Sequence, residues 1–204
     1  MIISIAHSKG GCGKSLLTLN LAPLFKSLVL IDLDTQNSIS QINQFRERKF
    51  KIFQAKKQEE LFDLLDENED KNIIIDCGGI DSDINRLAVA NSDILIVPVK
   101  DNSFEILAFK RYIKVIEKLV EKNHDLKVLA LLNNVHAQSK DFERLKILVE
   151  NYSFIKLAKT IIRTRADYAN FLEGGTTVFE KDKTKKASKE MKQLYKEIKD
   201  LHNG

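Results

Sequence analysis

A glycine-rich run near the start of the chain has the residue types that hold a phosphate group. Residues 8–15 read Ser-Lys-Gly-Gly-Cys-Gly-Lys-Ser, after the apolar run 2–6 and before a leucine-rich segment. Glycines let backbone N–H groups curve around phosphate oxygens, and a helix that follows directs its positive N-terminus at them. Lys14 can reach the β and γ phosphates, and the Ser15 hydroxyl can bind Mg²⁺. The run therefore predicts a nucleotide-binding loop rather than a plain turn between strand and helix.

Other polar residues that could serve this loop follow apolar runs further along the chain. Asp32 and Asp34 follow the run 28–31, Asp76 follows 72–75, and Asn133 follows 128–132. The carboxyl ends of parallel strands meet at one edge of a sheet, where ligands of such sheets bind. We therefore expect these side chains to converge on the glycine-rich loop.

The elements that must position these residues are short buried strands alternating with helices. Five runs are continuously apolar and β-branched, as strands covered on both faces are: 2–6, 28–31, 72–75, 94–97 and 128–132. Between them, Ile106, Phe109, Ile113, Ile116 and Val120 share one helical face. The alternation predicts a doubly wound α/β fold with a mostly parallel sheet and helices on both faces. The charged segment 46–71 is less regular, and we expect a strand near 50–53 and a helix over 58–65 there.

Composition agrees with one soluble domain over residues 1–204. The chain is 43% hydrophobic and 30% charged, and no apolar run approaches the length of a membrane span. No basic leader precedes the first strand, so we expect a cytoplasmic protein in which Cys12 and Cys77 stay reduced. The net charge is +4, and eight lysines lie between residues 181 and 199. That concentration favours a polyanionic partner.

The loop resembles the deviant Walker A box of the ParA/MinD family of P-loop ATPases, K-G-G-x-G-K-[ST]. The common P-loop pattern has glycine where this chain has Ser8, and it does not specify Lys9. In the family, the extra lysine reaches the phosphates on the partner subunit of a nucleotide-sandwich dimer. The resemblance implies that Lys9 supplies positive charge in trans only when two ATP-bound chains meet. The alternative for Lys9 is a solvated surface lysine.

Two further segments resemble the switch and Walker B motifs of that family. Residues 30–38 are similar to the segment D-x-D-P-Q, with Thr35 in place of the proline. The resemblance implies that Asp34 orients the attacking water near the metal while Asp32 ends the strand; alternatively, both aspartates cap the next helix. Residues 72–79 resemble a Walker B strand in which Asp76 holds Mg²⁺. The Cys-Gly-Gly that follows Asp76, where many relatives have Thr-Pro-Pro, is typical of small plasmid-partition members.

The site predicted from loop and resemblance together binds ATP and Mg²⁺. Asn133 is the candidate for reading adenine, and a strand-ending asparagine in a turn is its alternative. The segment 161–175 resembles a late loop and helix beside the base. The predicted nucleotide-binding residues are Lys9, Gly10, Gly11, Cys12, Gly13, Lys14, Ser15, Leu16 and Asn133. The predicted catalytic residues are Lys9, Lys14 and Asp34, and the predicted metal ligands are Ser15, Asp34 and Asp76.

The end of the chain predicts a basic amphipathic helix over about 187–201. Its apolar face is Met191, Leu194, Tyr195, Ile198 and Leu201. The candidate DNA-binding residues are Arg163, Arg165, Lys185, Lys189, Lys192, Lys196 and Lys199, which would contact phosphates without reading sequence. The alternatives are a solvated helix face, because acidic residues dilute the charge, and a helix that lies on anionic lipid. The apolar face lacks Trp and Phe, which disfavours lipid.

The resemblance implies a partition ATPase of the ParA type with slow intrinsic hydrolysis. It would dimerise on ATP, bind DNA nonspecifically on the nucleoid, and be released when a centromere-binding ParB-type partner stimulates hydrolysis. A MinD-like membrane-associated ATPase and a cargo-positioning ATPase acting on a protein surface are the alternatives. A metal or redox site at Cys12 and Cys77 is disfavoured, because the two cysteines do not form a ligand motif.

Overall fold

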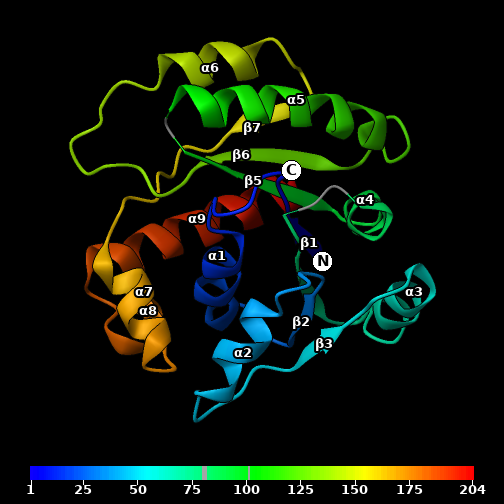
Figure 1. Ribbon diagram of the computed structural model, residues 1–204, viewed down its shortest axis with the longest axis vertical. Helices are drawn as coiled ribbons and strands as arrows, with labels where there is room; N and C mark the ends of the chain where they lie inside the picture. Colours follow the sequence, from blue (N-terminus) through cyan, green and yellow to red (C-terminus); the bar gives the residue numbers. More distant parts are fainter. Residues whose placement is uncertain (80–81, 101) are drawn as a thin grey trace.

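The strands form one parallel sheet with the first strand at its centre (Figure 1). The computed structural model describes residues 1–79, 82–100 and 102–204, and within them the sheet has seven strands in the order β3-β2-β4-β1-β5-β6-β7. The strands are β1 (Ile2–Ile5), β2 (Leu28–Asp32), β3 (Ile52–Gln54), β4 (Asn72–Asp76), β5 (Ile94–Val99), β6 (Lys127–Leu132) and β7 (Ile155–Leu157). Ile3 of β1 aligns with Ile74 of β4 on one side and with Ile94 of β5 on the other.

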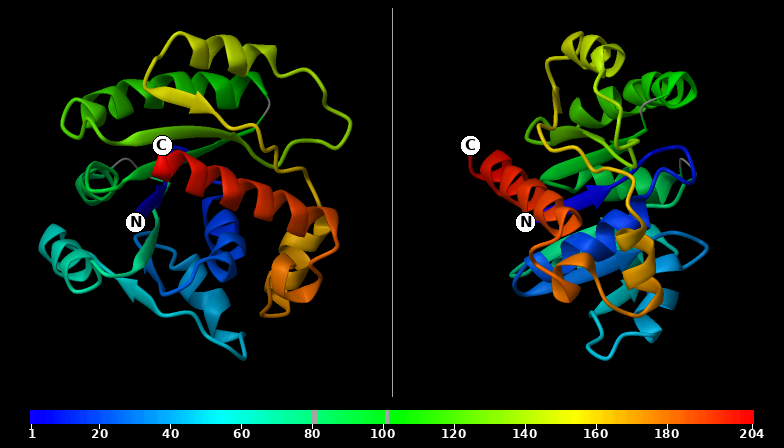
Figure 2. Two further views of the ribbon diagram at one scale, coloured as in Figure 1. Left: turned by 180° about the vertical axis from the view of Figure 1, so that it is seen from behind. Right: turned by 90° about the vertical axis from the view of Figure 1, so that its left-hand side faces the viewer.

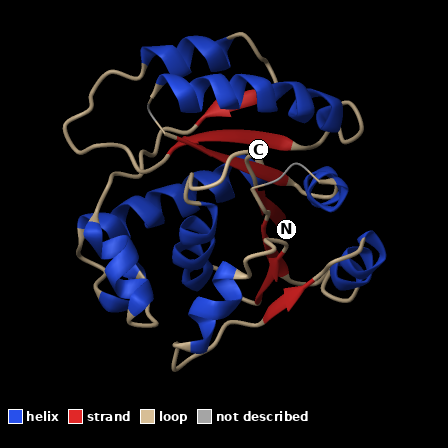
Figure 3. Cartoon of the chain, in the orientation of Figure 1, coloured by secondary structure: helices blue, strands red, loops and turns tan. Residues whose placement is uncertain are grey.

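Helices cover both faces of the sheet, as Figure 3 shows. One hydrophobic layer joins the sheet to α3 (Gln58–Asp66), α4 (Asp83–Ala90), α5 (Ser103–Val120) and α6 (Glu143–Glu150). The other joins it to α1 (Lys14–Leu21), the 3₁₀ turn η1 (Ala22–Leu24), α2 (Ser38–Gln44), α7 (Ala166–Glu173), α8 (Val178–Lys181) and α9 (Lys186–Asn203). Successive β4 residues alternate between the layers, Ile73 and Ile75 in the first and Ile74 in the second. This double burial explains why the strands are apolar throughout.

Helix α9 lies across one face of the sheet (Figure 2). Its residues Met191, Leu194 and Ile198 are fully buried against the sheet layer. Lys127 of β6 donates from Nζ to the carbonyls of Leu201 (2.8 Å) and His202 (3.1 Å), which fastens the last turn. The apolar face of α9 is therefore part of the core.

The predicted fold class is confirmed, with differences in detail. The five predicted strands are present, and most of them extend one or two residues further. The strand expected near 50–53 is shorter and later, at Ile52–Gln54, and its helix runs over Gln58–Asp66. The predicted helix 187–201 begins one residue earlier and ends two residues later. Strand β7 was not predicted, because its three residues include the exposed Lys156 at an edge and show no apolar run.

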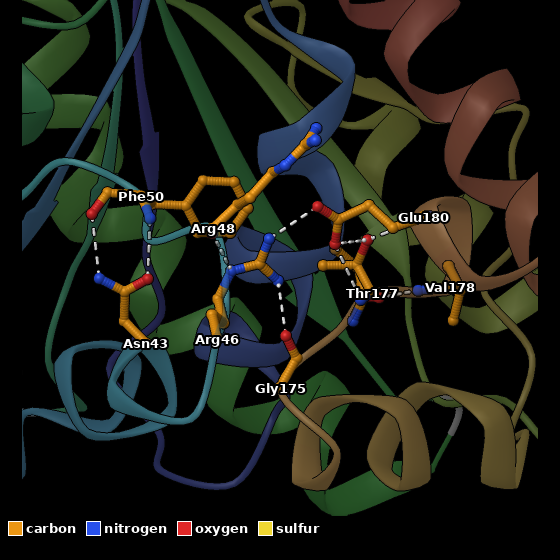
Figure 4. Close-up of polar contacts among 9 residues, drawn as sticks. Asn43, Arg46, Arg48, Phe50, Gly175, Thr177, Val178 and Glu180 are labelled. Carbon is orange, nitrogen blue, oxygen red and sulfur yellow. Dashed lines mark hydrogen bonds and ion pairs between the residues drawn. The ribbon is translucent and has the colours of Figure 1, made fainter.

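A polar junction around the buried Arg46 fastens the loop after α2 to α8 and the segment that precedes it (Figure 4). The Arg46 side chain donates to Glu180 Oε1 (2.7 Å) and to the carbonyls of Arg48 (3.1 Å) and Gly175 (3.4 Å). Its guanidinium also lies 3.9 Å from the centre of the Phe50 ring. Glu180 Oε2 accepts from the Thr177 amide (3.0 Å) and hydroxyl (2.9 Å). Both oxygens of this carboxylate therefore have partners.

Close backbone contact at Gly175 reinforces the junction. Gly175 has φ of +68°, and a Cβ added there would collide with the carbonyl of Phe45. Glycine meets both conditions, a left-handed conformation and no side chain.

Among the described residues, none of the helices combines the length and the apolar character that a membrane crossing needs.

Candidate phosphate-binding site

The glycine-rich loop connects β1 to α1 at the carboxyl edge of the sheet. Gly11 and Gly13 have φ values of +74° and +93°, and a Cβ added at Gly10 or Gly11 would meet no atom within 4 Å. The loop therefore turns its backbone toward open space. A cavity of about 560 Å³ lies there. Its lining is Gly10, Gly11, Gly13, Lys14, Ser15, Leu16, Leu33, Asp34, Thr35, Gln36, Ser38, Gly78, Gly79, Ser82 and Asn85.

The segment after β4 forms the wall of the cavity opposite the loop. A Cβ on Gly79 would lie 3.2 Å from Gly10 Cα and 3.7 Å from Lys14 Nζ, so the two glycines pack closely. Gly79, Ser82 and Asn85 line the cavity but were not among the predicted site residues. Only the Cys-Gly-Gly sequence after Asp76 hinted at this, because glycine there permits the close approach.

The Lys14 side chain is held by its own loop. It is only 5% exposed. Its Nζ donates to the carbonyl of Lys9 (3.2 Å) and lies 3.9 Å from Cys12 Sγ. Neither partner is anionic, so a phosphate oxygen is a stronger acceptor for this ammonium group. The arrangement fits a lysine that exchanges a loop carbonyl for a bound phosphate.

Asp76 is a buried carboxylate near Ser15 and Lys14. It ends β4 in register with Ile5, which precedes the loop, and with Asp32. Neither carboxylate oxygen makes a hydrogen bond of regular geometry with a described residue, although the Ser15 hydroxyl lies near enough to interact with the carboxylate. Burial raises the pKa of Asp76 to about 7, partly offset by the Ser15 hydroxyl and by Lys14, whereas Asp32 and Asp34 raise it further. Hard oxygen ligands beside a phosphate loop suit Mg²⁺, so Asp76 and Ser15 fit the predicted metal site.

Asp32 and Asp34 have different surroundings. Asp32 Oδ2 accepts from the Ser40 hydroxyl (2.7 Å) and amide (3.2 Å), and Oδ1 accepts from the Asp34 amide (3.2 Å). Asp32 therefore ties β2 to the first turn of α2, and burial raises its pKa. Asp34 accepts from the Gln36 amide (3.0 Å) and lines the cavity. The contacts of Asp32 match the alternative that it caps the next helix, while the position of Asp34 at the cavity suits its predicted role of orienting the attacking water.

Asn133 lies beneath the loop and does not line the cavity. Its side chain is buried and donates from Nδ2 to the carbonyl of Cys12 (2.7 Å). A Cβ on Gly13 would collide with this amide. This contact supports the loop at its tightest turn, so Asn133 acts as a loop support in this structure. Its contact with adenine stays a prediction. The sequence placed Asn133 at the correct edge but did not specify the direction of its side chain.

Lys9 is held by an acidic side chain from α5. Lys9 Nζ lies 2.6 Å from Glu105 Oε1, and the two side chains are 41% and 6% exposed. The Lys9 amide donates to His7 Nδ1 (3.0 Å). His7 is buried with its ring stacked 5.4 Å from that of Tyr112, and burial is the main cause that lowers its pKa to about 4. His7 therefore supports the loop from within the core, and Glu105 is a site residue that sequence reasoning missed.

The two cysteines are buried thiols of the loop region. Cys12 Sγ donates to the Lys9 carbonyl (3.4 Å), and burial raises the pKa of Cys77 to about 12. Within the part of the chain that the structure describes, no cluster of three or more His, Cys, Asp or Glu side chains is placed to hold a metal ion.

The predicted DNA-binding residues differ in availability. Arg165 pairs with Glu190 (2.6 Å), Arg163 donates to the carbonyls of His136 (3.0 Å) and Ser139 (2.7 Å), and Lys185 pairs with Asp167 (3.0 Å). These contacts weigh against the two arginines as phosphate ligands. Lys189, Lys192 and Lys196 are exposed on α9, and Lys199 is half-buried. Lys196 also borders a larger hollow of about 690 Å³ between β7 and α9, far from the glycine-rich loop.

Comparison with known proteins gives a consistent match. Residues 3–178 match the model of the CobQ/CobB/MinD/ParA nucleotide binding domain. The chain is 22% identical over 206 residues to the maintenance of carboxysome distribution protein A of Halothiobacillus neapolitanus, covering 96% of this chain and 95% of that protein.

Solved structures have the same fold. The MinC:MinD cell division protein complex of Aquifex aeolicus matches with a TM-score of 0.75 and 18% identity, covering 98% of this chain and 95% of that one. A putative plasmid partition protein of Borrelia burgdorferi B31, bound to AMPPNP, matches with a TM-score of 0.67 and 17% identity, covering 98% of both chains.

Proposed function

The chain belongs to the CobQ/CobB/MinD/ParA family of nucleotide-binding domains, and we propose that it is an ATPase of the ParA type that uses Mg²⁺. The observation that carries the proposal is the buried Asp76 carboxylate, which makes no regular hydrogen bond to the described residues and ends the strand beside the phosphate loop. An unpaired buried carboxylate is costly unless a ligand completes it. A cation bound with a nucleotide would do so.

Each residue of the loop edge has a defined task in this proposal. Loop amides from Gly10 to Lys14 and the start of α1 hold the phosphates. Lys14 leaves the Lys9 carbonyl and binds the β and γ phosphates, while Ser15 and Asp76 hold the metal. Mg²⁺, when bound, neutralises charge on the phosphate oxygens. Asp34, at the cavity wall, orients the water for in-line attack on the γ phosphate.

Lys9 completes the site of a second copy. It lies at the rim of the loop with a partly exposed side chain, whereas Lys14 is buried inside it. A lysine at the rim can reach across an interface and add charge to the partner's phosphates, as an arginine finger does. We therefore propose a nucleotide-sandwich dimer that forms on ATP binding, with slow hydrolysis in the absence of a stimulating partner.

The ATP-bound dimer would bind DNA nonspecifically and release it after hydrolysis stimulated by a ParB-type centromere-binding partner. The exposed lysines 189, 192 and 196 on α9 support this surface, and it would place the protein on the nucleoid in the cytoplasm. The apolar face of α9 is packed on the sheet, so that helix offers lipid no apolar face. This packing favours DNA over a membrane as the surface to which the dimer binds.

A cargo-positioning role is the second candidate. A relative aligned over nearly the whole chain is named for carboxysome distribution. In that role, the same ATP cycle acts on the surface of a protein assembly instead of a plasmid centromere complex. The two candidates share the site and differ in the partner.

Two measurements test the proposal. Calorimetry should give Mg²⁺-dependent binding of ATP that Lys14→Ala abolishes; wild-type protein without such binding would refute the ATPase itself. Co-sedimentation with DNA and with anionic liposomes, with ATP or ADP over a salt series, should give ATP-dependent binding to DNA that weakens steeply with salt. Binding to liposomes alone would favour a membrane role, and binding to neither would favour a protein cargo.

A further inference from the structure

Lys9 contacts four other residues of its own chain, one of them Cys12, whose Sγ donates to the Lys9 carbonyl (3.4 Å). The Lys9 ammonium pairs with Glu105 (2.6 Å), its amide donates to His7 Nδ1 (3.0 Å), and its carbonyl accepts from Lys14 Nζ (3.2 Å). Both lysines of the loop thus have partners within their own chain. The residue proposed to act in a second copy is turned toward α5 of its own copy.

The position of Glu105 suits it to hold the charged ammonium group of Lys9. Its amide donates to the Asn102 side chain (3.0 Å), which caps α5, so the backbone at this point is fixed. The Glu105 side chain is 6% exposed, and only one of its oxygens is engaged. The other, Oε2, has no hydrogen-bond partner among the described residues. A purely structural carboxylate at this depth would have both oxygens satisfied, since buried polar atoms are normally hydrogen-bonded.

We propose that Glu105 is a positioning residue that holds Lys9 in cis in the nucleotide-free chain and so raises the ATP-bound protein concentration needed for dimerisation. The inference rests on the proposed trans role of Lys9. To reach a partner's phosphates, the Lys9 ammonium must leave Glu105. The free energy of that exchange is subtracted from the free energy of dimer formation.

The connection through the Lys9 carbonyl couples release to nucleotide binding. When Lys14 turns to a phosphate, the Lys9 carbonyl loses its ammonium donor. The backbone of Lys9 is then held by fewer contacts, while its side chain gains an anionic alternative on the opposing copy. The pair is half exposed on the lysine side, where ion pairs are weak, so release does not require a large free energy.

The test compares Glu105→Gln with Glu117→Gln, an exposed glutamate on the same helix. Sedimentation velocity with ATP and Mg²⁺ over a protein concentration series gives the midpoint of dimerisation. Both copies must release Lys9, so a factor of about two to five for each pair predicts that Glu105→Gln dimerises at about four- to twenty-five-fold lower concentration than wild type. Glu117→Gln should match wild type. An unchanged or higher midpoint for Glu105→Gln overturns the inference.

A second readout needs no nucleotide. An amine-reactive reagent is added to the nucleotide-free protein, and the rate of Lys9 modification is followed by mass spectrometry. This rate should rise about two- to fivefold in Glu105→Gln and stay unchanged in Glu117→Gln. Glu105→Asp, which shortens the side chain and retains the charge, should behave like Glu105→Gln and serves if the glutamine variant misfolds. Equal labelling rates in wild type and both Glu105 variants overturn the inference.

The two readouts separate this inference from the proposed function. If the wild-type protein does not dimerise with ATP, the proposed dimer fails, while the labelling experiment still reports whether Glu105 holds Lys9. If wild type dimerises and neither the midpoint nor the labelling rate responds to Glu105, the inference alone fails.

Discussion

Two ion pairs of this molecule are built differently. At the junction of Arg46 and Glu180, the guanidinium has three hydrogen-bond acceptors and an aromatic ring, and both carboxylate oxygens have donors. At the loop edge, Glu105 uses one oxygen on Lys9, and the other has no partner among the described residues. The same holds for buried atoms of Asp76, His7 and Asn133.

The difference separates stability from function. A polar network whose members all have partners fixes one conformation, because any rearrangement loses several hydrogen bonds at once. Buried polar atoms that lack partners destabilise the free protein and are explained when a ligand or another chain completes them. The junction is therefore expected to matter for folding, and the loop edge for binding.

Removing Arg46 should give the largest loss of stability. Arg46→Ala removes the hydrogen bonds of a buried guanidinium and opens space beside Phe50, and we expect about 2–3 kcal/mol lower free energy of unfolding. Urea denaturation measures it. Arg48→Ala is the control, because Arg48 contributes only a backbone carbonyl to the junction and its side chain is exposed. A loss below about 1 kcal/mol in Arg46→Ala would place the junction among weak surface pairs.

Removing the charge of Asp76 should have the opposite effect on stability. The folded pKa of Asp76 is about 7, above the ordinary value, so the folded chain becomes less stable as pH rises from about 4 to about 7. Asp76→Asn should therefore raise the free energy of unfolding of the nucleotide-free protein at about pH 8, by roughly 2 kcal/mol, and abolish Mg²⁺-dependent nucleotide binding. A destabilised Asp76→Asn protein would contradict the ligand-binding interpretation of this carboxylate.

The junction should also respond to acid. Burial opposes ionisation of Glu180, but Arg46 and Thr177 outweigh it and hold the pKa of Glu180 below its usual value. Its stabilising contribution is thus complete above about pH 4.5 and is lost as pH falls through the folded pKa. Glu180→Gln should cost about 1 kcal/mol at neutral pH, since a third of the side chain contacts water, and the difference from wild type should shrink in acid. A difference that is independent of pH would point to packing instead of charge.

Removing Lys9 should have the smallest effect on stability. Lys9→Ala breaks a pair whose lysine is 41% exposed, so we expect a loss below about 1 kcal/mol in urea denaturation. The same variant should bind ATP and stay monomeric in sedimentation. Normal dimerisation and turnover by Lys9→Ala would remove the trans role and make Lys9 a surface lysine.

Sequence alone predicted the parts of this molecule that local pattern determines. Continuous apolar runs gave five of the strands, and the loop 8–15 located the site, since both depend on residues close together in the chain. The convergence of Asp34 and Asp76 on the loop followed from strand ends in a parallel sheet.

Contacts between distant segments could not be predicted. Glu105 meets Lys9 across 96 positions, and Arg46 meets Glu180 across 134. The direction of the Asn133 side chain depends on the space left under Gly13, which only the folded loop defines. Strand β7 depends on pairing with β6 more than on its own residues, because an edge strand of three residues has little local signal.

The central place of β1 has a consequence for how the chain assembles. The strand made first pairs with strands about 70 and 90 residues later, since Ile3 aligns with Ile74 and Ile94. Such distant pairing slows folding and delays it until the later segments are available. On the ribosome, the phosphate loop therefore lacks its opposite wall until β4 and the segment after it have emerged, and nucleotide can help to fold the chain only after that point.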